Sequence, residues 1–170
     1  MKKTLPKKAP KFFDYNVYVA CSLTHAPKEF RDEVDIFKDK LGLICNVVDF
    51  GCLGDKPPHE VYRWDIQECV NKSDLVFAIC DFPAIGLGYE IATQVEVRKK
   101  PCIAVAHDKS LVTSLILDTR QPGFEFKRYK NLRKDGLKIV KDKLQKMCVA
   151  DTVNKMKQTR QLKRAKVKVK

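Results

Sequence analysis

The sequence predicts an α/β fold: a single doubly wound, five-stranded, mainly parallel sheet of the Rossmann or flavodoxin-like type. Short apolar runs alternate with longer segments of helical periodicity along the 170 residues, and this alternation is typical of βαβ units. Glycine and proline separate many of the segments. Hydrophobic residues make up 44% of the chain, which suits the core of one domain. With right-handed crossovers, the expected strand order is 2-1-3-4-5.

Five segments are predicted as strands, and the first four are short, mostly apolar runs bounded by turn residues or by a helical pattern. The third has no polar residue before Asp81 and is expected to be buried. The last is expected at an edge of the sheet. The predicted strands are residues 16–21, 43–50, 75–80, 101–106 and 124–129.

The segments between them have helical patterns. In the first, Phe30, Val34, Phe37 and Leu41 recur at spacings of three and four, which puts them on one helix face, and Gly42 ends the pattern. A loop with Gly54 and two prolines precedes the second. The predicted helices are residues 28–41, 60–72, 88–99, 110–117 and 134–153.

The net charge of +13 is concentrated at the two ends of the chain. Residues 1–11 carry five lysines and no acid, and residues 151–170 carry eight Lys or Arg and one acid. The remainder is nearly neutral, which argues against a nucleic-acid-binding fold. We therefore expect a basic N-terminal tail over residues 1–11, a folded domain over residues 12–153, and a basic, mobile tail over residues 154–170. Both tails can add non-specific contact with polyanions.

Cysteine usage and hydropathy indicate where the protein works. The seven cysteines are odd in number and form no CxxC pair, so free thiols in a reducing, cytoplasmic compartment explain them best. Neither Cys nor His has metal-ligand spacing, and we expect no metal and no cofactor. No apolar run approaches the roughly 20 residues that span a bilayer, and the basic N-terminus lacks the apolar core of a secretory signal.

The segment from Asp81 to Glu90 is the strongest functional signal. It joins a predicted buried strand to a predicted helix, and Gly86 and Gly88 lie at the junction. Glycine permits close approach of a ligand, and a helix N-terminus offers free N–H groups. In this interpretation Glu90 lies in the first turn, ionised beside a small ligand. The alternative is that the glycines serve a tight turn and Glu90 is a solvated acid.

Three motifs carry a family resemblance. They are the first-strand run from Val17 to Ser22, Asp65 upstream of Ser73-Asp74, and the block Pro-Ala-Ile-Gly-Leu-Gly-Tyr-Glu at residues 83–90, followed by Lys100-Pro101. With them the chain resembles the nucleoside 2-deoxyribosyltransferase family, including the 2'-deoxynucleoside 5'-phosphate N-hydrolases. The resemblance covers about residues 16–118. It implies cleavage of the N-glycosidic bond of a 2'-deoxynucleoside and transfer of the sugar to another base.

The resemblance also implies roles for single residues. Glu90 matches the nucleophile that forms a covalent deoxyribosyl ester, Asp65 the acid that assists the leaving base, and Tyr18 a tyrosine beside the nucleophile. Ser22 and Gly88 match residues of a sugar or phosphate pocket. Gly86 is expected to bind the same ligand on the helix-terminus argument above, and Asp81 either contacts the sugar or merely ends its strand. Thr113 and Ser114 match a segment that reaches a neighbouring subunit, so a homo-oligomer, dimer or larger, is expected.

Other interpretations stay open. Relatives that cleave 5'-monophosphates carry a serine where this chain has Ala84 and an arginine where it has Thr24. These differences favour a free nucleoside, whereas the match at Thr113 and Ser114 favours a nucleotide. Asp65 is alternatively a plain first-turn helix acid. The other candidate functions are a 2'-deoxynucleoside 5'-monophosphate N-glycosidase and a non-catalytic nucleotide-binding module.

Overall fold

The structure is a computed structural model that describes residues 12–23, 26–48 and 56–168. One five-stranded sheet has the order β2-β1-β3-β4-β5, and every neighbouring pair is parallel. This confirms the predicted fold class, the strand order and the edge position of the last strand. The strands are β1 (Phe12–Cys21), β2 (Cys45–Val48), β3 (Leu75–Ile79), β4 (Cys102–His107) and β5 (Phe124–Tyr129).

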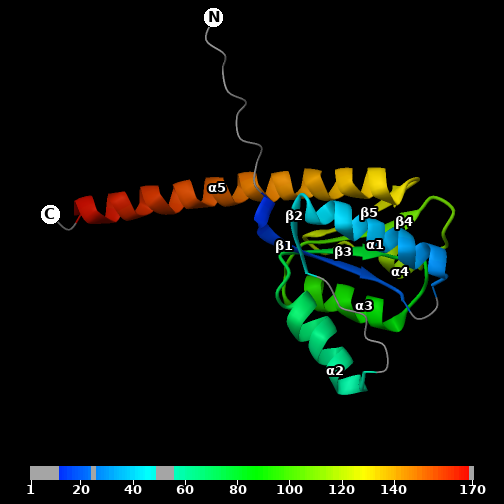
Figure 1. Cartoon of the computed structure of the whole chain (residues 1–170). Coiled ribbons are helices and arrows are strands. Elements are labelled where there is room, and N and C mark those ends of the chain that lie inside the picture. The colour runs from blue at the N-terminus through cyan, green and yellow to red at the C-terminus, as the bar shows by residue number, and fades with distance from the viewer. Residues whose placement is uncertain (1–11, 24–25, 49–55, 169–170) are drawn as a thin grey trace, which may run out of the picture.

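Helices cover both faces of the sheet, with α1 and α5 on one side and α2 and α3 on the other (Figure 1). Three segments are π-helical and are labelled η. In chain order the helical segments are α1 (Lys28–Gly42), α2 (Pro58–Tyr62), η1 (Arg63–Val70), α3 (Ile85–Ala92), η2 (Thr93–Val97), α4 (Ser114–Leu117), η3 (Leu132–Gly136) and α5 (Leu137–Lys168). No helix among the described residues combines the length and the apolar character needed to cross a bilayer.

Alternate residues of β1 supply two separate cores, because successive strand side chains point to opposite faces. Val17 and Val19 join the core under α1 and α5, whereas Tyr18 and Ala20 join the core under η1 and α3. Tyr18 is almost fully buried, with 4% of its surface exposed. The fold therefore directs this phenol towards the helices that carry Asp65 and Glu90.

The helix predicted from residue 88 begins three residues earlier, at Ile85. Gly86 and Gly88 are therefore helical residues, so the alternative that both serve a tight turn is wrong, and Gly86 lies inside the helix rather than before it. Glycine is a poor helix former, by about 1 kcal/mol relative to alanine. Leu87 and Ile91, four residues apart, are both buried against the sheet, and this packing outweighs the weak local propensity.

Two other helices also differ from the prediction. The last helix does not end near Val153 but continues to Lys168, because residues 154–168 contain neither glycine nor proline and are rich in good helix formers. Much of the predicted C-terminal tail is therefore helical. The helix predicted from residue 110 begins only at Ser114, where the Thr113 hydroxyl accepts a hydrogen bond from the Leu115 N–H and caps the first turn.

Several predictions fall on residues outside the described part of the chain. These are the basic segment 1–11, the position of Thr24, the end of the second predicted strand at residues 49–50, and the glycine of the loop at Gly54.

Candidate active site

A cavity of about 270 Å³ lies where the strand order reverses, beside β1 and between η1 and the start of α3. Ligands of doubly wound sheets bind at such a switch point. Strand β1 and the residues after it contribute Tyr18 and Ser22, η1 contributes Asp65, and α3 contributes Gly86 and Glu90. Five of the nine residues predicted from the sequence therefore line one cavity.

Glu90 is the most unusual residue of this cavity. It lies in the second turn of α3 and only 8% of its surface is exposed. Burial, together with the nearby charge of Asp65, raises the pKa of Glu90 from 4.5 to about 8, although a hydrogen bond from Tyr18 opposes the shift. The expectation that a helix N-terminus keeps Glu90 ionised is wrong, because Glu90 lies beyond the free N–H groups of the first turn and desolvation dominates.

Tyr18 connects the two acidic side chains of the cavity. Its hydroxyl, which carries a single proton, donates to Asp65 Oδ1 at 3.3 Å and also lies within hydrogen-bond reach of Glu90. The pKa of Tyr18 is raised well above 10, first by burial and then by the charges of Glu90 and Asp65, so the group stays a neutral donor. Burial also raises the pKa of Asp65. The site is a pair of carboxyl groups joined by a phenol, in which both acids hold protons more tightly than in water.

Asp65 lies well inside a continuous helical segment that begins at Pro58. The alternative that Asp65 is a first-turn acid therefore does not fit this segment. The local helix is π-helical, and such segments are frequent at functional sites.

Two buried polar atoms of this cavity lack a partner. Among the described residues, Ser22 Oγ and Glu90 Oε2 are the buried side-chain oxygen or nitrogen atoms without a hydrogen bond. Leaving such an atom unsatisfied costs about 1–3 kcal/mol. Both atoms belong to residues that line the same cavity, where a polar ligand would supply the missing hydrogen-bond partners.

The two glycines leave room at the start of α3. A Cβ atom added at Gly86 or Gly88 would meet nothing within 4 Å. Gly86 lines the cavity of Glu90, whereas Gly88 lines a neighbouring apolar cavity of about 320 Å³ between α3 and α4. Gly86 thus lets a ligand approach the backbone near Glu90, and Gly88 faces a different space.

Asp81 does not line the cavity of Glu90. Its Oδ1 accepts hydrogen bonds from the His107 N–H at 2.9 Å and the Ser110 hydroxyl at 2.5 Å, and its Oδ2 accepts one from the Tyr129 hydroxyl at 2.7 Å. Both carboxylate oxygens are therefore engaged by β4, β5 and the loop after β4. This geometry fits the interpretation in which Asp81 ends its strand and ties neighbouring strands together.

Thr113 and Ser114 also lie away from Glu90, at the start of α4. Thr113 lines the apolar cavity between α3 and α4. Large apolar side chains around this cavity face solvent: Ile85 is 96% exposed and Leu111 is 90% exposed.

Lys38 is the charged residue in the lining of the Glu90 cavity that was not predicted from the sequence. It lies on α1, its side chain is only 12% exposed, and it lines the cavity together with Glu90 and Asp65. Next to the buried Phe37, a lysine at this helix position looks like an ordinary solvent-facing residue. Only the packing of α1 beside the end of β1 brings it to the cavity. Within the described residues, no group of three His, Cys, Asp or Glu side chains is placed to hold a metal ion.

Comparisons with known proteins bear on the fold. No protein-family model matches this sequence, and no curated protein matches it. Among solved structures, the chain is similar to the Clostridium botulinum CMP N-glycosidase BcmB, with a TM-score of 0.53 and 18% sequence identity. The match covers 74% of this chain and 97% of the BcmB chain. At this identity the likeness shows a shared α/β fold, in agreement with the predicted sheet.

Proposed function

We propose that this protein is a nucleoside 2-deoxyribosyltransferase-like enzyme that cleaves the N-glycosidic bond of 2'-deoxynucleosides and transfers the sugar to another base. The observation that carries the proposal is the pair formed by the buried Glu90 and the half-buried Asp65, joined through Tyr18, with Glu90 Oε2 unpartnered in a cavity. The likeness to a chain described as a CMP N-glycosidase supports the same class of bond cleavage.

In this mechanism the ionised Glu90 attacks the anomeric carbon of deoxyribose. A C–O ester bond forms, the C–N bond breaks, and its electron pair leaves with the base, to which Asp65 gives a proton. The raised pKa of Asp65 suits it to hold that proton. A second base then attacks the same carbon and displaces Glu90, and the proton that this base loses returns to Asp65. Two displacements retain the configuration, and retaining enzymes separate their carboxyl groups by about 5 Å.

A 2'-deoxynucleoside 5'-monophosphate N-glycosidase is the second candidate. The specific observation in its favour is Lys38, the cationic side chain among the described residues that line the cavity. A lysine can pair with a substrate phosphate as a point charge. Water would then take the place of the second base, so that the ester on Glu90 is hydrolysed.

A panel of substrates separates these functions. Each 2'-deoxynucleoside and each 5'-monophosphate is incubated with the protein, with and without a second free base, and the products are separated by chromatography. A transferase forms a new nucleoside only when the second base is present. Release of deoxyribose 5-phosphate from monophosphates supports the second candidate. Absence of cleavage across the whole panel contradicts both, and binding without cleavage supports the nucleotide-binding module.

The rate is expected to depend on pH through Glu90. Because its pKa is raised to about 8, the carboxyl group of the free protein is protonated at lower pH and the nucleophilic form grows as pH increases. Because the mechanism also needs a proton on Asp65, kcat/KM should be bell-shaped, with a rise as Glu90 ionises and a fall where Asp65 loses its proton. An ordinary glutamate would already be ionised at pH 6. A profile that is flat between pH 6 and 9 would contradict this assignment.

We also propose a homodimer or larger assembly in which the α4 region lies near a partner's cavity. The support is the exposed apolar surface formed by Ile85, Leu111 and Leu115, which are 96%, 90% and 78% exposed. Light scattering at micromolar concentration should give the mass of a dimer or more, and the double change Leu111→Glu with Leu115→Glu should give a monomer. Leu43→Glu, at another residue that is 79% exposed, is the matched control. A monomeric wild-type protein would exclude the assembly.

A further inference from the structure

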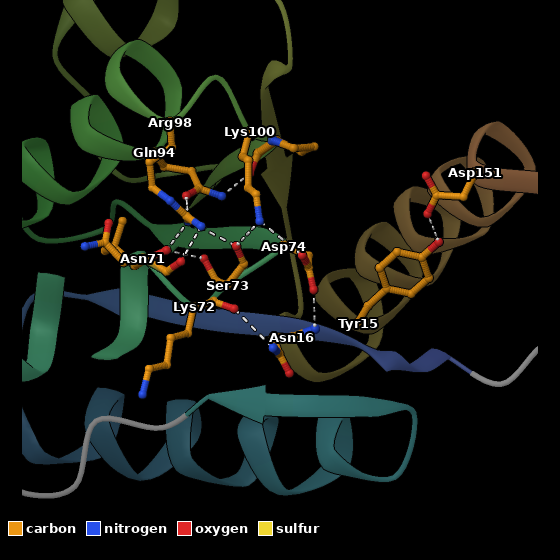
Figure 2. Close-up of polar contacts among 12 residues, drawn as sticks. Tyr15, Asn16, Asn71, Lys72, Ser73, Asp74, Gln94, Arg98, Lys100 and Asp151 are labelled. Carbon is orange, nitrogen blue, oxygen red and sulfur yellow. Dashed lines mark hydrogen bonds and ion pairs between the residues drawn. The ribbon is translucent and has the colours of Figure 1, made fainter. Parts of the chain in front are cut away.

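Away from the cavity, near the amino ends of β3 and β4, a polar cluster joins the two helices that carry the acidic pair (Figure 2). Its centre is Arg98, which directly follows η2. Arg98 Nη1 donates to the carbonyl oxygens of Val70 and of Ser73, the latter at 3.0 Å, and Nη2 donates to the carbonyl oxygen of Asn71. These carbonyl groups lie at and just after the C-terminal end of η1, where the helix leaves acceptors unsatisfied.

The guanidinium group is itself held in place by Gln94. Arg98 Nη1 donates to Gln94 Oε1 at 2.6 Å, while Gln94 Nε2 donates to the carbonyl oxygen of Pro101 at 3.0 Å. Gln94 is fully buried. The planar fork of Arg98 is thus fixed relative to η2 and to the start of β4, and it reaches across to η1 with the rest of its donors.

A second cation strengthens the same junction. Lys100 Nζ contacts the carbonyl oxygen of Ser73 at 3.3 Å and Asp74 Oδ1 at 3.2 Å. Asp74 Oδ2 in turn accepts the backbone N–H of Asn16 in β1 at 3.0 Å. The cluster therefore connects β1, η1, η2 and β4.

The two helices joined here are the carriers of the candidate acids. Asp65 belongs to η1, which ends at Val70, and Glu90 belongs to α3, which continues without a break into η2 and Arg98. Each helix is stiff, so a shift at its C-terminal end moves the carboxyl group that it carries. From this geometry we infer that Arg98 is a positioning residue that sets the spacing of the Asp65 and Glu90 carboxyl groups. It touches neither acid, and its catalytic effect rests on the proposed function.

Arg98→Gln tests this inference because it keeps a polar side chain and removes the charge and the fork. Misplacement of reacting groups by about 1 Å can cost about 100-fold, so kcat should fall by about 10- to 100-fold while KM changes little. Arg98→Lys should restore part of the loss. Arg133→Gln is the matched control, because the ion pair of Arg133 joins η3 to Glu33 of α1 at 2.9 Å and involves neither η1 nor η2.

A titration of Glu90 by carbon-13 NMR gives a readout that does not depend on turnover. The groups that face Glu90 are Asp65 on η1, Tyr18 on β1 and Lys38 on α1, with the Cys102 thiol of β4 nearby. Because the Asp65 charge helps to raise the pKa of Glu90, a wider spacing in Arg98→Gln should lower that pKa relative to the wild type.

The outcomes separate a positioning role of Arg98 from a purely structural role. A purely structural role predicts a lower melting temperature with unchanged kcat and an unchanged Glu90 titration, and that result would overturn the inference. If Arg98→Gln does not fold, Arg98→Lys carries the same comparison. An inactive wild-type protein would count against the proposed function alone, because the shift of the Glu90 titration in the variant would still test Arg98.

Discussion

Glu90→Gln is expected to lower the rate of N-glycosidic cleavage by about 10³-fold or more, since loss of a covalent nucleophile removes a whole catalytic pathway. The glutamine keeps the shape of the side chain in its buried position beside Tyr18. It cannot form an ester with the anomeric carbon. Steady-state cleavage of the best substrate from the panel measures the effect, and mass spectrometry of the wild-type protein after rapid quenching should detect the deoxyribosyl adduct.

Glu96→Gln is the matched control for this change. Glu96 lies on η2, exposed to solvent, and pairs with Lys99 at 3.5 Å. Its replacement makes the same chemical change on the same helical segment and should leave the rate within about twofold, because exposed ion pairs contribute little. Near-normal turnover of Glu90→Gln would exclude the covalent mechanism. The nucleotide-binding module would instead be favoured if the wild-type protein binds nucleotides without cleaving them and Glu90→Gln leaves that affinity unchanged.

Truncation to residues 12–153 is expected to leave kcat and KM at wild-type values while removing most of the affinity for polyanions. The cut keeps every residue that lines the cavity and keeps the hydrogen bond of 2.5 Å between the Tyr15 hydroxyl and Asp151. It removes lysines 2, 3, 7, 8 and 11 and all eight Lys or Arg after Asp151. For a protein that makes about six phosphate contacts, affinity falls about 10³-fold between 50 and 200 mM salt.

Elution from a heparin column measures this second effect. The whole chain should elute at higher salt than the truncated chain, and the substitutions Lys155→Gln and Lys157→Gln should lower the elution salt of the whole chain. Lys28→Gln and Lys40→Gln, two exposed lysines of α1, form the control pair and should have little effect. Loss of turnover on truncation at low salt would show that the ends of the chain belong to the site, against the division into a neutral domain and basic ends.

The order of the sheet was predictable because each strand overlaps a segment predicted from the sequence, and the handedness of βαβ units restricts how such segments can be joined. Tyr18, Ser22, Asp65 and Glu90 were predicted to share a site, and the structure places all four along one cavity. The protonation of Glu90 was not predictable. It depends on how deeply η1 and β1 bury the carboxyl group, and that is a tertiary property.

Other features depended on contacts between distant parts of the chain. The early start of α3 follows from burial of Leu87 and Ile91 against the sheet. Helix propensities of single residues do not report such tertiary burial. Lys38 and Arg98 look like ordinary surface residues in the sequence. Their neighbours in space, the end of β1 for Lys38 and the C-terminal end of η1 for Arg98, come from segments more than fifteen residues away in the chain.

The length of α5 has a practical consequence for measuring the size of the particle. At about 1.5 Å per residue, a helix of 32 residues is about 48 Å long, and its C-terminal part runs out beyond the sheet (Figure 1). A compact domain of 170 residues has a radius of gyration of only about 15 Å. The elongated shape increases friction, so a single subunit will elute early in gel filtration and resemble a dimer there. The number of subunits must therefore be taken from an absolute mass measurement or from sedimentation, in which the contributions of shape and mass can be distinguished.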